Sequence, residues 1–130
     1  MATVERFPSQ PLGNVTLPFS EAVRVGDVLF LSGNLGHYPG KLELVPGGIA
    51  AETRQALENL GAVLQRRGLG FGDVVKVTCM LADMSEWQAM NAAYTAFFAK
   101  DELPARSAFG TSGLALGARI ELEAIAAIRG

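Results

Sequence analysis

Residues 49–81 read IAAETRQALENLGAVLQRRGLGFGDVVKVTCML, a helical pattern followed directly by a strand pattern. In the first part, apolar or small residues recur at helical spacing, and Gly68 follows them as a stop signal. This helical face consists of Ile49, Thr53, Ala56, Leu57, Leu60, Val63 and Leu64. Phe71-Gly72-Asp73 then turns the chain into a run rich in β-branched residues. The stretch predicts a helix over residues 49–67 and a strand over residues 74–81.

On the N-terminal side of this stretch, residues 19–33 read FSEAVRVGDVLFLSG and have the pattern of a hairpin. Two short apolar runs at 20–24 and 28–32 are joined by Val25-Gly26-Asp27, whose Gly-Asp pair indicates a turn. Glycines and prolines then interrupt any regular pattern over residues 34–48. We therefore expect two paired strands followed by a surface loop.

On the C-terminal side, a second helix is predicted to begin at Ser85, with Gln88 three residues later completing a capping box. Its apolar face is expected to comprise Trp87, Met90, Tyr94, Phe97 and Phe98. A strand is predicted within residues 103–110, LPARSAFG, and a last strand within residues 118–128, ARIELEAIAAI. Helices separated by single strands imply crossovers that place both helices on one face of a mixed sheet. The other face would be bare, which favours an oligomer.

Composition limits the possible functions. The 130 residues are expected to form a single domain, residues 1–130, with 49% hydrophobic and 18% charged residues. A net charge of −2 provides no basic surface for a polyanion, so nucleic acid is disfavoured as a partner. No apolar run reaches membrane-spanning length, and MATVERFPSQ has charges and a proline where a signal peptide has its apolar core. We expect a cytoplasmic protein that needs no disulfide, since Cys79 is the only cysteine.

The strands predicted within residues 103–110 and 118–128 each carry charged side chains that the apolar pattern of a buried strand does not account for. Alternation places Arg106 on one face of its strand with Ala108 and Gly110, and places Glu121 and Glu123 together on one face of the last strand. One interpretation is a solvated strand end whose carboxylates pair with nearby basic residues. The other is a site in which a carboxylate and Arg106 surround a small substrate, because consecutive strands are often neighbours in a sheet. The pattern alone leaves both open.

Several segments together resemble a known family. They are PFSEAVRVGDVLFLSG, IAAETRQALENLGAVL, GDVVKVTCMLADM, MNAAYTAFF, LPARS and IELEAIA, in that order. This set is similar to the reactive intermediate deaminase family, also called Rid, YjgF-type or endoribonuclease L-PSP-like, and it extends from Pro18 to Ala126. The resemblance implies a chorismate-mutase-like α+β domain that forms a homotrimer. It also implies sites in the clefts between subunits.

The resemblance implies hydrolysis of 2-imino acids, such as 2-iminopropanoate and 2-iminobutanoate, and of their enamines, to 2-keto acids and ammonia. Arg106 matches the family arginine that holds the substrate carboxylate, and Glu121 matches the carboxylate that positions water. No cofactor and no metal are implied. The positions that match the family's substrate-binding residues are Phe19, Ser32, Gly33, Asn91 and Ala108.

Some positions differ from the common family pattern. Ala108 replaces the usual cysteine, Phe19 the usual tyrosine and Asn34 the usual glutamine. These differences indicate a divergent branch and leave the substrate open. The alternatives are a regulatory trimer that binds a small carboxylate without turnover, and a hydrolase of a carbamate or amide-like metabolite. His37 is read as a lone loop residue and Cys79 as a small core residue.

Overall fold

The strand and helix patterns form one sheet of six strands with two helices behind it. The computed structural model describes residues 3–129. Short 3₁₀ turns, which include Phe71–Asp73, Met84–Glu86, Thr95–Phe97 and Ala115–Gly117, join several of the main elements. The strands and helices are β1 (Val4–Pro8), β2 (Ser20–Val25), β3 (Val28–Leu35), α1 (Gly48–Arg66), β4 (Val74–Leu81), α2 (Trp87–Tyr94), β5 (Ala105–Gly110) and β6 (Ile120–Ala127).

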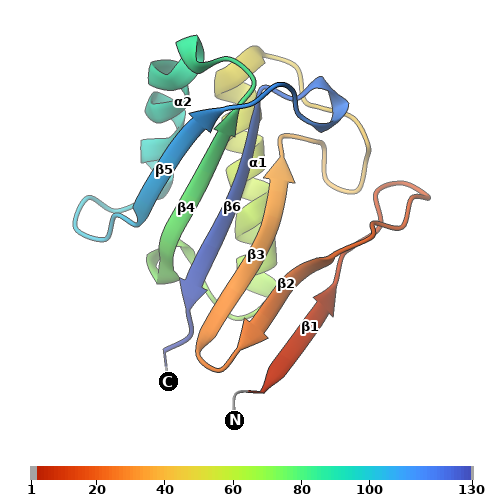
Figure 1. The fold of residues 1–130 in the computed structure, drawn as a ribbon, viewed down its shortest axis with the longest axis vertical. Helices are drawn as coiled ribbons and strands as arrows, with labels where there is room; N and C mark the ends of the chain where they lie inside the picture. Colours follow the sequence, from red (N-terminus) through yellow and green to blue (C-terminus); the bar gives the residue numbers. More distant parts are fainter. Residues whose placement is uncertain (1–2, 130) are drawn as a thin grey trace.

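The strand order in the sheet is β1-β2-β3-β6-β4-β5. The β4 and β5 strands are parallel, and the other neighbouring pairs are antiparallel. Both helices lie on the same side of the sheet, behind it in the view of Figure 1. The mixed sheet with helices on one face confirms the predicted α+β class. The expectation that the last two strands are neighbours is wrong, because β4 lies between β5 and β6.

The hydrophobic core fills the space between the sheet and the helices. Alternate residues of β3, β4 and β6 point toward α1 and α2, as the period of two requires. The largest fully buried side chains are Leu29, Leu57, Leu60, Leu64, Leu81, Met90, Ile120, Leu122, Val77, Thr53 and Cys79. None of the described helices is long and apolar enough to cross a membrane. The predicted helical face of α1 and the burial of Cys79 are both confirmed.

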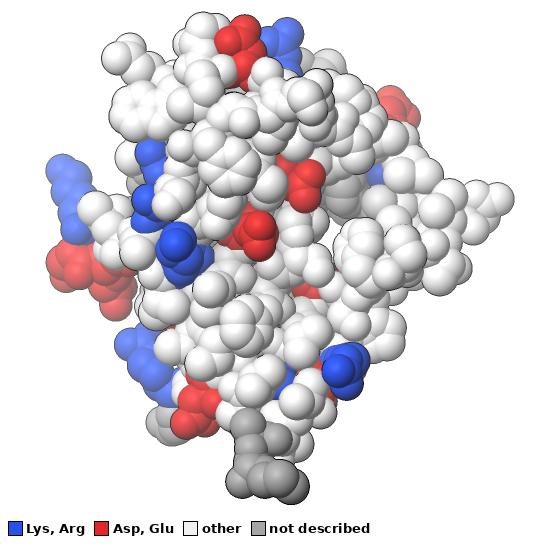
Figure 2. Space-filling model, viewed as in Figure 1, with Lys and Arg blue, Asp and Glu red and all other residues white. Residues whose placement is uncertain are grey.

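The opposite face of the sheet, which we call the open face, has no helix over it (Figure 1). Large apolar side chains are exposed there, including Phe30 at 45% and Phe109 at 47%. Register places Glu121 on the same face, since it pairs with Met80, which in turn pairs with Phe109. Figure 2 shows acidic groups near the middle of this otherwise largely uncharged face, with basic groups toward the β5 edge. An apolar sheet face of this kind is typical of a surface that another chain covers.

Two elements differ from the predictions. The sequence pattern did not indicate β1, because this strand lies at the edge of the sheet and four of its five residues are exposed. The helix start at Ser85 is also wrong. Asp83 forms the cap, because its carboxylate accepts a hydrogen bond from the backbone N–H of Ser85 at 2.9 Å, and a 3₁₀ turn precedes α2. The helix also ends at Tyr94, and Trp87 of its predicted apolar face is 39% exposed.

Glu52 of α1 helps to fix the relative positions of β3 and β6, which supply Ser32, Gly33 and Glu121 to the cavity described below. Its side chain is 6% exposed, and Oε1 accepts a hydrogen bond from the backbone N–H of Arg119 at 2.9 Å. Gly36 packs against the Glu52 backbone so closely that any Cβ at Gly36 would clash with it. One buried side chain and one close approach therefore hold the start of β6 and the end of β3 against α1.

Candidate active site

Glu121 lies over a β-bulge that the glycine in β3 makes possible. Leu31 pairs with Ala124 and Asn34 pairs with Leu122, so Ser32 and Gly33 form the irregular part of the β3 ladder. The Ser32 hydroxyl donates a hydrogen bond to the Ser20 carbonyl at 2.6 Å. The Glu121 carboxylate occupies the space where a side chain at position 33 would lie. The bulge therefore fixes where this carboxylate can be.

The surroundings of Glu121 favour its protonated form. Burial raises the pKa of its carboxyl group above the usual value of 4.5, and the neighbouring carboxylate of Glu123 raises it further. No arginine or lysine forms an ion pair with Glu121 among the residues that the structure describes. The interpretation of this strand end as a carboxylate paired with a basic residue therefore does not hold for Glu121. A half-buried carboxyl group with a raised pKa is suited to exchange protons with a bound water.

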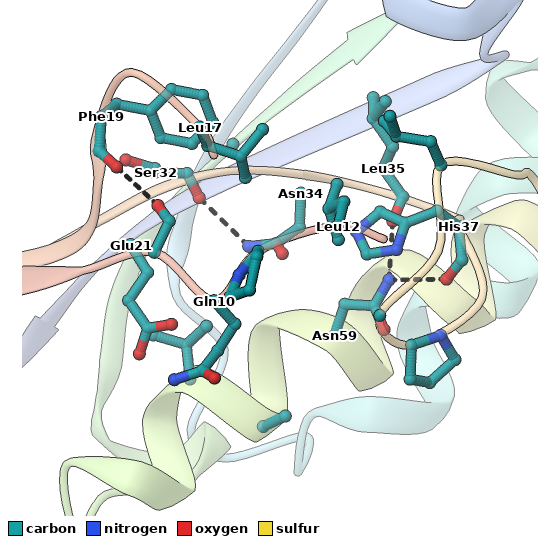
Figure 3. A pocket seen from close by; sticks show the side chains of 18 of the residues that line it. Gln10, Leu12, Leu17, Phe19, Glu21, Ser32, Asn34, Leu35, His37 and Asn59 are labelled. Atoms are coloured by element: carbon teal, nitrogen blue, oxygen red, sulfur yellow. Dashed lines mark hydrogen bonds between the residues drawn. The ribbon is translucent and has the colours of Figure 1, made fainter. Parts of the chain in front are cut away.

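A cavity of about 590 Å³ lies next to this carboxylate. Its wall includes Phe19, Ser32, Gly33 and Glu121, four of the predicted site residues, which we call the Glu121 cluster. Figure 3 shows Phe19 and Ser32 on one side of the cavity and His37 and Asn59 on the other, with Asn34 between them. The cavity has the size of a typical metabolite site.

Phe19 forms part of the cavity wall at its outer side. Its side chain is 49% exposed, and it precedes β2 in a segment that runs along the cavity. The Ser9 hydroxyl donates a hydrogen bond to the Phe19 carbonyl at 2.6 Å, which ties the two ends of that segment together. Phe19 thus lies at the cavity, and its role in binding a substrate stays a prediction.

The other predicted site residues form a second group, at the β5 edge of the sheet. The Arg106 guanidinium on β5 lies 4.8 Å from the ring centroid of Tyr94 and 5.8 Å from that of Trp87. Both rings belong to α2, where Trp87, Asn91 and Tyr94 share one helical face because they are spaced by four and three residues. We call Asn91, Arg106 and Ala108, with these two rings, the Arg106 cluster. The rings orient the guanidinium by cation–π contact.

Two buried polar atoms in the Arg106 cluster have no hydrogen-bond partner among residues 3–129. They are Oδ1 of Asn91 and the hydroxyl of Tyr94. Buried polar atoms are normally paired, so both are available to a ligand or to another chain. Burial, followed by the nearby Cys79, raises the pKa of Tyr94 to about 12, so its hydroxyl remains a neutral donor at neutral pH.

Cys79 lies beside Ala108 in the parallel β4–β5 pair. Burial raises the pKa of its thiol to about 11, although the Arg106 charge lowers it slightly. The thiol is therefore protonated at neutral pH, and because it is fully buried it is unsuited to act as a nucleophile. This agrees with its interpretation as a core residue.

Within one chain, the two clusters lie on opposite faces of the sheet. Arg106 is opposite Val77 and Val77 is opposite Ala124, so Arg106 shares the helix-covered face with Ala124. Glu121 is three residues before Ala124 on β6 and therefore faces the other way. The expectation that strand adjacency brings Arg106 and Glu121 of one chain together is wrong. One chain thus holds two separate groups of candidate residues.

The sequence analysis did not assign Tyr94 and Trp87 to a site, because both fitted an apolar helix face. Their spacing from Asn91 was the feature that could have revealed them, since positions four and three residues apart share one side of a helix. His37 lies in the cavity wall, and its Nδ1 is 2.8 Å from the Tyr38 carbonyl. In the described part of the chain, no three His, Cys, Asp or Glu residues are grouped as metal ligands.

Replacing Gly33 with alanine should disable the Glu121 cluster while leaving the fold intact. A Cβ at position 33 would overlap the Glu121 carboxylate, which is the movable end of a flexible side chain and would shift away. We expect kcat/KM to fall at least about tenfold, with little change in melting temperature. Gly70→Ala is the matched control, because a Cβ there meets no atom within 4 Å. Equal activity of the two variants would mean that the position of Glu121 over the bulge is not important.

The chain is therefore a small α+β protein with a metabolite-sized site. Its mixed sheet has both helices on one face, and its cavity contains a carboxylate. The family model described as Endoribonuclease L-PSP matches residues 11–128. The 2-iminobutanoate/2-iminopropanoate deaminase of Mus musculus is 44% identical over 109 residues, which make up 84% of this chain and 80% of that protein.

Solved structures agree with this match. The crystal structure of the yeast protein YEO7 has a TM-score of 0.88 at 33% identity, covering 98% of this chain and 100% of that one. The YjgF gene product of E. coli has a TM-score of 0.84 at 32% identity, covering 96% of this chain and 99% of that one. The chain belongs to the Endoribonuclease L-PSP family, and the resemblance to the YjgF-type, reactive intermediate deaminase proteins is confirmed.

Proposed function

We propose that this protein is a hydrolytic deaminase of 2-imino acids and of the enamines in equilibrium with them. In this reaction a water adds to the imine carbon and the carbon–nitrogen bond breaks, which gives a 2-keto acid and ammonia. The activity is supported by the relative from Mus musculus, whose name is 2-iminobutanoate/2-iminopropanoate deaminase. We further propose that each site combines the Glu121 cluster of one chain with the Arg106 cluster of a second copy in a homotrimer.

The observation that carries the two-chain site is the separation of the clusters on opposite faces of the sheet. A small substrate cannot contact both clusters of one chain through a sheet. A second copy that packs on the apolar open face could place its β5 edge near the first chain's Glu121. The exposed Phe30 and Phe109 side chains on that face support such packing, because they would otherwise remain in water.

In the proposed site, Arg106 binds the substrate carboxylate. A guanidinium presents two parallel N–H groups that match the two carboxylate oxygens, and the Tyr94 and Trp87 rings would hold this fork in a fixed plane. The unpaired Oδ1 of Asn91 and the Tyr94 hydroxyl could bind further polar atoms of the substrate or of the partner chain. The family resemblance further implies that backbone groups at Ala108 contact the imine nitrogen.

Glu121 is proposed to position the attacking water and to accept its proton. Its carboxyl group has a raised pKa, so it is a stronger base than an ordinary glutamate when it is ionised. A protonated imine is already electrophilic, so orientation and proton transfer are sufficient for this hydrolysis. Ser32 and Gly33 fix the carboxylate at the cavity, and Phe19 limits the space above it.

The assay that tests the activity generates the imine in place. An amino-acid oxidase converts alanine or 2-aminobutyrate to 2-iminopropanoate or 2-iminobutanoate, and the disappearance of imine is followed with and without this protein. We expect faster loss of imine with a matching release of keto acid and ammonia. Tight binding of the 2-keto acid without any acceleration would instead support a regulatory carboxylate-binding protein. RNA cleavage is not proposed, because a net charge of −2 is a poor match for a polyanion.

A further inference from the structure

The cavity beside Glu121 is much larger than the small imines named in the proposed function. At roughly 30 Å³ for each water-sized group, the about seven non-hydrogen atoms of 2-iminobutanoate need on the order of 200 Å³. The cavity has about 590 Å³. It extends away from Glu121 to α1, where Ala62 and Val63 line it. A substrate with a one- or two-carbon side chain would leave most of this space unfilled.

Much of the wall of this space beyond the Glu121 cluster is apolar. The leucines among the lining residues come from the N-terminal segment, from β3 and the loop after it, and from the turn before β6. These leucines are Leu12, Leu17, Leu35, Leu42 and Leu116. An apolar wall of this kind binds hydrocarbon rather than charged groups.

The main polar groups of the inner wall are already paired within the chain. Nδ2 of Asn59 donates hydrogen bonds to the carbonyls of Leu35 and His37, at 2.9 and 3.0 Å, and Oδ1 of Asn59 accepts one from Gln55 at 2.9 Å. Arg66 donates from two nitrogens to the two carboxylate oxygens of Glu21, at 3.0 and 2.8 Å. Beside these paired groups, a polar or charged side chain would find free partners among the described residues only at the Gln10 amide and at Nε2 of His37, so most of its desolvation would not be compensated.

We infer that this cavity receives the side chain of the substrate, and that the protein prefers 2-imino acids with a branched or aromatic hydrocarbon side chain. The inference rests on the proposed deaminase function and names the substrate class of that same site. The reacting carbon would lie at the Glu121 end, near Ser32 and Phe19, and the side chain would point toward Asn59 and His37 at the opposite end (Figure 3).

The test compares imines that an amino-acid oxidase forms from alanine, leucine and phenylalanine. We expect kcat/KM for the leucine- or phenylalanine-derived imine to exceed that for 2-iminopropanoate by about tenfold or more, since each buried methylene contributes to discrimination. Similar values for all three imines, or faster turnover of the smallest, would overturn the inference. No turnover of any imine would instead refute the proposed function itself.

Two substitutions locate the preference in the cavity. Ala62→Leu adds bulk at the α1 wall and should lower kcat/KM for the leucine-derived imine about tenfold, with the alanine-derived imine nearly unaffected. Leu42→Ala removes a lining side chain that is 44% exposed, so the fold should tolerate it, and it should lower turnover of the larger imine several-fold. Ala92→Leu, at an exposed position on α2 outside the cavity, is the matched control. Equal effects of Leu42→Ala on large and small imines would overturn the assignment.

Discussion

Replacing Arg106 with alanine is expected to lower kcat/KM for a 2-imino acid by roughly 30- to 1000-fold. This corresponds to about 2 to 4 kcal/mol of lost transition-state stabilisation when a bidentate guanidinium–carboxylate pair is removed from a largely desolvated site. The fold should be retained, because Arg106 is only half-buried and has no ion-pair partner among the described residues. Steady-state kinetics and thermal melting of the same preparation measure both effects.

Arg106→Lys separates the geometry of the guanidinium from its charge. Lysine keeps the positive charge but lacks the planar fork and stacks less well on the Tyr94 and Trp87 rings, so most of the loss should remain. Arg54→Ala is the matched control, because Arg54 is exposed on α1, far along the chain from both clusters. Wild-type kinetics for Arg106→Ala would remove this residue from the site.

Replacing Glu121 with glutamine is expected to lower kcat by about 100-fold or more while KM changes little, as for the loss of a general base. Glutamine retains the shape and the hydrogen-bonding capacity of the side chain but cannot accept a proton from water. Glu58→Gln, at an exposed position on α1, controls for the loss of one negative charge. A folded Glu121→Gln variant with normal kcat would exclude the proposed role.

The pH profile gives an independent test of Glu121. Because burial and Glu123 raise the pKa of Glu121 above 4.5, less of it is ionised in mild acid than of an ordinary glutamate. Activity that needs the carboxylate should therefore be lost as the pH falls through this raised pKa, so the acidic limb of kcat/KM should lie above pH 4.5. In Glu121→Gln this limb should disappear. A limb that is identical in both proteins would have to come from another group.

Much of the fold could be predicted from local patterns. The Gly26-Asp27 turn, the helical face of α1 and the alternation of β4 were all visible because each depends on neighbours in the sequence. The edge strand β1 was missed because it buries little, and its pairing with β2 depends on backbone contacts that composition does not reveal. The Asp83 cap was missed because Asp83 and Ser85, two residues apart, could each begin the helix.

The candidate site was less predictable, because it depends on strand order. Arg106 and Glu121 were identified from a family resemblance, but their relation in space could not be predicted from the pattern. Strand β6 lies between β3 and β4, which leaves β5 at the edge, and the strand register places Arg106 and Glu121 on opposite faces. The roles of Gly33 and the bulge also required the structure, since the close approach of Glu121 joins residues far apart in the chain.

The central claim is that two chains complete each site, and mixing two inactive variants tests it most directly. Arg106→Ala and Glu121→Gln chains carrying different tags would be produced together, and the assemblies that contain both tags would be isolated. Every mixed trimer should have one cleft with an intact Arg106 from one chain and an intact Glu121 from the other, and so about a third of the wild-type rate. If the two residues act within the same chain, no mixed assembly contains an intact site, and activity that stays at the level of the separate variants would contradict the account.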